Sequence, residues 1–212
     1  MRIMVTAFDA FGGESVNASG EILSRLQAPA GCELVKQILP TQFVRGPEVL
    51  YSCLDAVKPD ILLLLGQAGG RSAVTPERVA INCMDARIPD NAGYTPVDLP
   101  IDANGPDAYL TNIPIHAAVS HLKEAGLPAA ISNTAGTFVC NCLFYKAMQY
   151  VRTHAASPIL CDFIHIPYLM GQPHTEHLPD LAPDACAATV QELLDWTAHY
   201  FETQKEVSGG KT

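Results

Sequence analysis

The chain has 212 residues, of which 48% are hydrophobic and 17% are charged, and its formal net charge is −9. This composition is typical of a globular protein with a substantial apolar core. The negative charge argues against a general nucleic-acid or anionic-membrane binder. No apolar run approaches the roughly 18–20 residues that a membrane span needs.

The chain contains seven cysteines at irregular spacings. Their odd number argues against a disulfide framework, and the first residues, "MRIMVTAFDAFGG", indicate a β-strand rather than a signal peptide. We therefore expect a cytoplasmic protein in a reducing compartment, where most of the thiols are small buried hydrophobic groups.

Strand and helix patterns alternate in the first third of the chain. We expect strands over 2–8 and 32–39, a helix from Asn17 or Ser19 to about Leu26, and a helix from about Pro47, where proline suits the first turn. The next run, "DILLLLG", is uniformly aliphatic, which is typical of a strand buried on both faces.

Between Gly66 and about Thr111 many turn-forming residues interrupt this pattern. We interpret the segment as a strand or hairpin with long surface loops, which are often functional in a compact domain. Regular order then returns, with predicted helices over 114–125, 139–154 and 184–203 and predicted strands over 128–133 and 158–166.

This order of elements predicts an α/β fold, a three-layer α/β/α sandwich around a largely parallel, partly mixed central sheet. We expect one domain over 1–205 and a flexible C-terminal tail over 206–212. Ligands of such sheets bind at the carboxyl ends of the strands. Four segments with chemically interesting residues follow predicted strands: "TAFDAFGG", "GQAGGRSAVTPERVAIN", "SNTAGTFVCN" and "FIHIPY".

The third of these segments leads into a predicted helix with Cys140 at or near its first turn. The unpaired amides and the positive dipole end stabilise a thiolate there, and the same amides can donate to an oxyanion. Cys142 lies roughly 200° further around a helix of 3.6 residues per turn, so a metal or disulfide shared by the two is geometrically poor. The segment alone leaves two interpretations open: a reactive Cys140, or two buried core thiols.

His165 lies near the end of a predicted strand, and Glu77 follows the glycine-rich turn "GQAGGR". Taken singly, such a histidine is more often a satisfied core or edge residue, and such a glutamate is more often a surface carboxylate, here paired with Arg78. Together with Cys140, the two supply the residue types of a cysteine–histidine–acid triad, in which the acid orients the imidazole.

Two other motifs carry less weight. The turn "GQAGGR" is neither G-x-G-x-x-G nor a phosphate-binding P-loop. His174 and His177 supply only half of a metal site, in a proline-flanked segment that favours a solvated loop.

The motifs "FDAFGG", "GQAGGRSAVTPERVAIN", "TAGTFVCN" and "FIHIPY" closely resemble the pyroglutamyl-peptidase I (pyrrolidone-carboxylate peptidase) family of cysteine peptidases, in the same order along the chain. The resemblance implies a cytoplasmic hydrolase that removes N-terminal pyroglutamate from peptides, needs no metal or other cofactor, and is commonly a homotetramer. It places the catalytic residues at Glu77, Cys140 and His165.

The resemblance also implies the substrate contacts. Phe8 and Phe11 would pack on the pyrrolidone ring, and Asn17 and Gln67 match polar positions around that pocket. We add Arg87, in "DARIPDN", as a further oxyanion donor.

The chain departs from the family pattern at Ala7, Ala10 and Gly20, where glycine, proline and tryptophan are common. We expect these departures to alter the rim of the pocket and to leave the chemistry unchanged. That chemistry is attack of the Cys140 thiolate on the pyroglutamyl carbonyl, with His165 carrying the proton to the leaving amine.

Two alternatives belong to other classes of protein. One is a metal-dependent hydrolase that uses His165, His174 and His177. The other is a non-enzymatic α/β ligand-binding protein in which Cys140 is structural.

Overall fold

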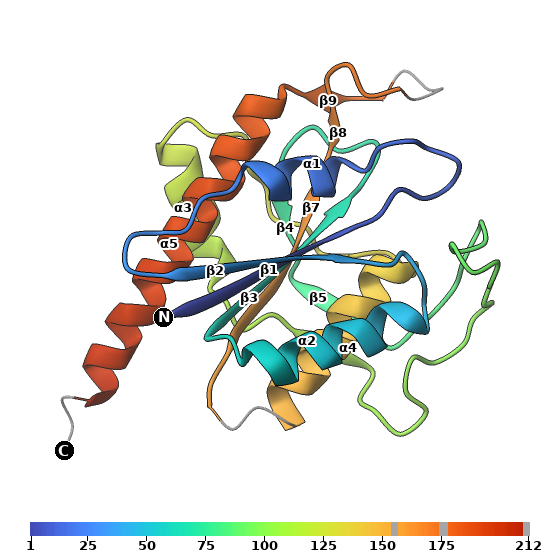
Figure 1. Ribbon diagram of the computed structural model, residues 1–212, viewed down its shortest axis with the longest axis horizontal. Helices are drawn as coiled ribbons and strands as arrows, with labels where there is room; N and C mark the ends of the chain where they lie inside the picture. Colours follow the sequence, from blue (N-terminus) through green and yellow to red (C-terminus); the bar gives the residue numbers. More distant parts are fainter. Residues whose placement is uncertain (154–156, 174–177, 210–212) are drawn as a thin grey trace.

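The computed structural model describes residues 1–153, 157–173 and 178–209, with the backbone alone for 207–209. Its central sheet has five strands in the order β2-β1-β3-β7-β4 (Figure 1). Their bounds are Arg2–Phe8 (β1), Glu33–Leu39 (β2), Ile61–Gln67 (β3), Thr75–Pro76 (β4) and Leu160–Ile166 (β7). The first three and β7 run parallel, whereas β4 is antiparallel to β7. The sheet is therefore largely parallel and partly mixed, as predicted.

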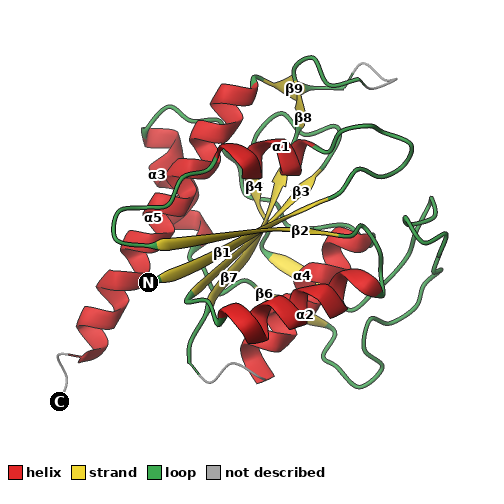
Figure 2. Cartoon of the chain, in the orientation of Figure 1, coloured by secondary structure: helices red, strands yellow, loops and turns green. Residues whose placement is uncertain are grey.

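Helices cover both faces of this sheet (Figure 2). On one face lie α1 (Ala18–Arg25), α3 (Ile115–Glu124) and α5 (Pro183–Gly209), and on the other lie α2 (Arg45–Val57) and α4 (Val139–Thr153). All seven residues of β3 are buried, which explains the aliphatic run in that strand. The predicted three-layer α/β/α sandwich is confirmed.

The first helix begins where the sequence predicts. Asn17 is its N-cap, and the Asn17 side chain accepts a hydrogen bond from the Ser19 amide at 3.0 Å. Ser19 in turn donates from its hydroxyl to Asn17 and accepts from the Phe8 amide, so α1 is tied to the end of β1.

The turn-rich segment after β3 forms a small hairpin with a long connection. The strands β5 (Val79–Ile81) and β6 (Ala108–Leu110) pair antiparallel, and residues 82–107 connect them. The buried Asn141 side chain in α4 exchanges hydrogen bonds with Ile81 and also donates to the Cys83 carbonyl, which fixes the start of this connection next to α4. Two further short strands, β8 (Tyr168–Leu169) and β9 (Asp180–Leu181), pair with each other.

The strand predicted over 128–133 is not a regular strand. The segment lies parallel to 74–78 through two isolated bridges, Val74 with Ala129 and Glu77 with Ser132. Backbone hydrogen bonds join the two segments on either side of Pro76, but Pro76 has no amide hydrogen to donate to Ala130, so a continuous ladder does not form.

The terminal helix also differs from the prediction. It continues to Gly209, beyond the residue 203 that we expected, so the tail predicted over 206–212 is helical as far as it is described, and residues 210–212 lie outside the described part. Among the described helices, none combines the length and apolar character needed to cross a membrane.

Candidate active site

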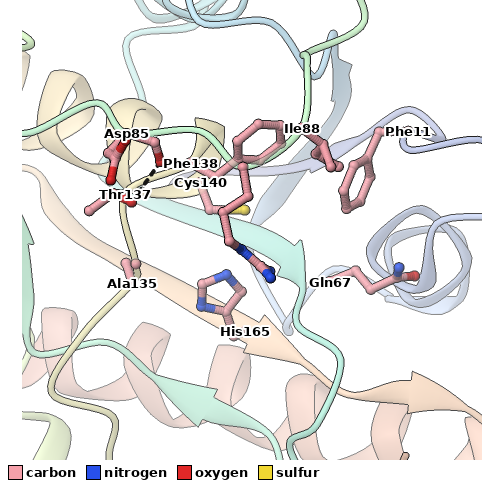
Figure 3. Close-up of a pocket in the computed structure, with 11 residues that line it drawn as sticks. Phe11, Gln67, Asp85, Ile88, Ala135, Thr137, Phe138, Cys140 and His165 are labelled. Carbon is pink, nitrogen blue, oxygen red and sulfur yellow. Dashed lines mark hydrogen bonds between the residues drawn. The ribbon is translucent and has the colours of Figure 1, made fainter. Parts of the chain in front are cut away.

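A pocket opens where the carboxyl ends of β3 and β7 meet the start of α4 (Figure 3). Its walls come from segments far apart in the sequence, and they include Phe11, Gln67, Arg87, Phe138, Cys140 and His165. The side chains of Cys140 and His165 point into the same cavity, and Phe11 and Gln67 lie on its other side (Figure 3). The fold therefore brings together the strand-end segments that the sequence singled out.

Cys140 is the second residue of α4 and is partly exposed, as expected for a residue of the first helical turn. Its sulfur lies over Gly66 of β3, because a Cβ atom at Gly66 would be only 3.0 Å from the Cys140 Sγ. Gly66 is the cross-strand partner of His165 in β7. Since paired residues of parallel strands direct their side chains to the same face, the sulfur and the imidazole are neighbours on that face.

His165 is held from behind by Glu77. The His165 Nδ1 and the Glu77 Oε1 are 2.7 Å apart, and the Glu77 side chain is fully buried. This contact makes Nδ1 a donor and leaves Nε2 free to accept a proton. The interpretation of Glu77 as a surface carboxylate paired with Arg78 is wrong, because Glu77 instead forms an ion pair with Arg71 at 2.8 Å and Arg78 donates to Asn133.

The electrostatics of the site favour an uncharged resting pair. Burial raises the pKa of Cys140 to about 12, with Glu77 adding to the shift and Arg71 and a backbone amide opposing it. Burial also lowers the pKa of His165, against the hydrogen bond and charge of Glu77. These shifts oppose the effect of the helix terminus at the sulfur and favour a thiol facing a neutral imidazole.

Cys142 is separate from this chemistry. It is buried, and its Sγ lies 3.7 Å from the Phe43 carbonyl, on the side of α4 that packs in the core. The two cysteines thus face different surroundings, as the helical geometry predicts.

Gln67 lines the pocket with an orientation fixed by its neighbours. Its Oε1 accepts hydrogen bonds from the Ala18 amide at 2.8 Å and from Gln172 at 2.6 Å, and its Nε2 donates to Glu14 at 2.7 Å. Nε2 carries a second N–H besides the one that it donates to Glu14. Glu14 also accepts from the Tyr168 hydroxyl, so this network joins the first loop to the segment after β7.

Phe8 and Asn17 are not in the pocket wall as the structure describes it. Phe8 is only 3% exposed and packs 6.2 Å from the ring of Phe163 in the core. Asn17 caps α1 and donates to the Asp9 carbonyl at 2.9 Å. Both side chains are therefore occupied by contacts within the protein, and they support the first loop instead of facing the pocket.

Phe138 is a pocket residue that the sequence analysis missed. Its ring lies 6.0 Å from Phe11 and 5.3 Å from Phe43, so it extends the aromatic wall on the side of α4. Its place in "TFVC", two residues before the nucleophile candidate, was an available signal. Arg87 lines the same pocket from the long connection after β5.

The three departures from the family pattern, at Ala7, Ala10 and Gly20, lie in different surroundings. Ala7 is fully buried in the core cluster that faces α1 and α5, so it is not part of a rim. A Cβ atom at Gly20 would meet only ordinary contacts, the nearest being the Phe8 carbonyl oxygen at 3.5 Å. Ala10 accepts a hydrogen bond from Asn91 at 2.9 Å through its carbonyl, which joins the first loop to the long connection.

Among the described residues, no group of three or more histidine, cysteine or acidic side chains could hold a metal ion. His174 and His177 lie outside the described residues.

Comparison with known proteins agrees with the motifs. A family described as "Pyroglutamyl peptidase" matches residues 1–195. The pyrrolidone-carboxylate peptidase of Escherichia fergusonii is 44% identical over 99% of this chain and 98% of that protein. Pyrrolidone-carboxylate peptidase 1 of Caldanaerobacter subterraneus is 50% identical over 81% of this chain and 85% of that protein.

Solved structures show the same likeness. The crystal structure of pyroglutamyl peptidase I from Bacillus amyloliquefaciens has a TM-score of 0.87 at 43% identity, covering 92% of this chain and 95% of that one. Pyrrolidone carboxyl peptidase from Pyrococcus furiosus has a TM-score of 0.90 at 34% identity, covering 95% and 100%. The chain therefore belongs to the pyroglutamyl peptidase family of cysteine-type peptidases.

Proposed function

We propose that this chain hydrolyses the bond after an N-terminal pyroglutamyl residue of peptides, with Cys140 as nucleophile, His165 as general base and acid, and Glu77 as the residue that orients the imidazole. One observation carries the proposal. The Cys140 sulfur lies over Gly66, the strand partner of His165, and His165 is hydrogen-bonded to the buried Glu77.

The reaction begins from the uncharged pair. As the Cys140 sulfur attacks the pyroglutamyl carbonyl, the neutral His165 takes the thiol proton, and the Glu77 carboxylate stabilises the imidazolium that forms. The tetrahedral oxyanion develops near the amides that begin α4, with Arg87 as a further donor from the pocket wall. His165 then protonates the leaving amine, and water hydrolyses the acyl-enzyme with His165 again as base.

The pocket matches the chemistry of the pyroglutamyl ring. The ring is neutral and half apolar, and the aromatic side chains of Phe11 and Phe138 offer it apolar contact. The remaining N–H of Gln67 can donate to the lactam carbonyl. In this proposal Phe8 and Asn17 act indirectly, through the first loop that carries Phe11, because Phe8 is buried and Asn17 caps α1.

The decisive experiment compares two cysteine variants with a pyroglutamyl chromogenic substrate. Cys140→Ser should abolish hydrolysis, whereas Cys142→Ser should keep most of it, because Cys142 is packed in the core. Retained activity in Cys140→Ser would reject the nucleophile. Loss of wild-type activity after prolonged dialysis against a chelator would instead favour a metal-dependent hydrolase.

The proposal includes a homo-oligomer, a tetramer by resemblance, in the cytoplasm. The residues from 81 to 110 expose several large hydrophobic side chains, among them Val97 at 69% and Leu110 at 60%, which supports association through this surface. All seven cysteines are free, which suits a reducing compartment. Light scattering coupled to size-exclusion chromatography tests the assembly, and a monomer at micromolar concentration would contradict it.

A further inference from the structure

A fourth residue contacts the segments that carry the triad. Arg71 lies in the turn after β3, and its Nη1 is 2.8 Å from the Glu77 Oε1. The same oxygen is 2.7 Å from the His165 Nδ1, so one carboxylate oxygen serves both the arginine and the histidine. The other oxygen of Glu77 has no hydrogen-bond partner among the described residues. Within the part of the chain that the structure describes, Arg71 is thus the charged partner of a carboxylate whose other contact is the imidazole.

The guanidinium also reaches the two neighbouring segments. Its Nη2 donates to the Thr134 carbonyl at 3.1 Å, in the turn that leads to Cys140. Its Nη1 also donates to the Thr75 hydroxyl, and that hydroxyl is 3.3 Å from the His165 carbonyl. The planar guanidinium of Arg71 can reach Glu77, Thr75 and Thr134 at the same time. The compact ammonium group of a lysine does not have this forked geometry.

The charge of Arg71 has a chemical consequence at the sulfur. The Glu77 carboxylate disfavours a negative charge on Cys140, and the Arg71 cation opposes this effect. At His165 the signs are reversed, because Glu77 favours the imidazolium and Arg71 disfavours it. Among the described residues that line the pocket, the other charged side chains are Asp85 and Arg87.

We propose that Arg71 is a positioning residue of the reaction proposed above: its guanidinium holds the Glu77 carboxylate against His165 and offsets the carboxylate charge beside the Cys140 sulfur. It touches neither substrate nor reacting atoms in this role. Without it, Glu77 would be free to turn away, and the developing thiolate would face an uncompensated negative charge.

The test compares Arg71→Met with wild type in kcat/KM as a function of pH. We expect kcat/KM at pH 8 to fall about 10–100-fold, the range for losing one hydrogen bond to a charged group. The acid limb of the pH profile, where kcat/KM falls as pH decreases, should move to higher pH, because removing the cation makes His165 easier to protonate. Arg71→Lys keeps the charge and should leave the acid limb near its wild-type position while kcat still falls.

A second readout needs no substrate. The rate of alkylation of Cys140 by iodoacetamide, followed by peptide mass spectrometry, should fall in Arg71→Met at every pH below full ionisation of the thiol. If the pyroglutamyl substrate proves wrong, this rate still reports the role of Arg71, so the two proposals fail separately. If Arg71→Met does not fold, Arg71→Gln keeps a donor for Thr134 and should show the same slower alkylation.

Arg78→Met is the matched control, since Arg78 is the next arginine along the same edge and pairs with Asn133. It should leave both the acid limb and the alkylation rate unchanged. A wild-type acid limb and alkylation rate in Arg71→Met, or equal shifts in Arg78→Met, would overturn the inference and leave Arg71 as a structural link only.

Discussion

A Cβ atom at Gly66 would lie 3.0 Å from the sulfur of Cys140. The same atom would lie 2.6 and 2.8 Å from two ring atoms of Phe163. The space next to Gly66 is therefore already occupied by the Cys140 sulfur and the Phe163 ring. Gly66 is therefore required because the sulfur needs this place beside His165, and no positive φ is involved.

Gly66→Ala should lower kcat/KM about 100-fold, because the added methyl group displaces the sulfur, and displacements of about 1 Å cost this much in rate. It should also destabilise the fold by about 1–3 kcal/mol through overpacking against Phe163. Gly46→Ala is the matched control. Its Cβ would meet Leu143 at 2.8 Å in the core between α2 and α4, so stability should fall without loss of activity per folded molecule.

Glu77→Gln should lower kcat about 10²–10⁴-fold, because an amide can present its N–H to the imidazole and favour the wrong tautomer, and it cannot stabilise the imidazolium. Steady-state kinetics with the pyroglutamyl substrate measures this loss. Glu48→Gln removes a charge from an exposed pair with Arg45 and should change nothing. Equal activity of Glu77→Gln and wild type would remove Glu77 from the mechanism.

The pH dependence of kcat/KM should follow His165. Burial lowers the pKa of this histidine below its ordinary value of 6.5, so the imidazole stays neutral and able to accept a proton until the pH falls below that value. Activity should therefore be complete at pH 7 and be lost at lower pH, through an apparent pKa under 6.5. An acid limb centred above pH 6.5 would show that the Glu77 carboxylate outweighs burial. Unchanged circular dichroism and Trp196 fluorescence at the low pH exclude acid unfolding as the cause.

Asp162 gives a prediction about stability rather than activity. It is 1% exposed in β7, one of its oxygens has no hydrogen-bond partner among the described residues, and burial raises its pKa well above the ordinary value of 3.8. The folded chain therefore keeps a proton that the unfolded chain releases, so this residue lowers the free energy of unfolding as pH rises above about 4.

Asp162→Asn should remove this dependence. Its advantage over wild type in the free energy of unfolding should grow with pH, by up to about 1.4 kcal/mol per pH unit until the folded pKa is reached. Denaturant unfolding at pH 5, 7 and 9 measures the difference. Asp184→Asn, at a solvent-exposed carboxylate paired with Arg25, should show no such trend. A difference that stays constant with pH would mean that Asp162 is ionised in the folded chain.

Much of the fold follows from local sequence patterns. The aliphatic run of β3, the cap at Asn17 and the start of α4 near Cys140 are encoded by neighbouring residues, and the structure agrees with each of them. The segment 128–133 has a strand-like composition, but whether it forms a regular ladder depends on its partner. That partner, β4, is only two residues long, and this could not be judged from the segment itself.

The sequence by itself determined the order of strands and helices, the chemical types available at the strand ends, and the family to which Cys140, His165 and Glu77 pointed. The tertiary structure decided which groups meet. It put Phe8 in the core and Phe138 in the pocket, and it made Arg71 rather than Arg78 the ion-pair partner of Glu77. It also surrounded the partly exposed Cys140 thiol with enough protein to raise its pKa. These outcomes depend on strand register and on desolvation by residues distant in the chain, and local periodicity carries no information about either.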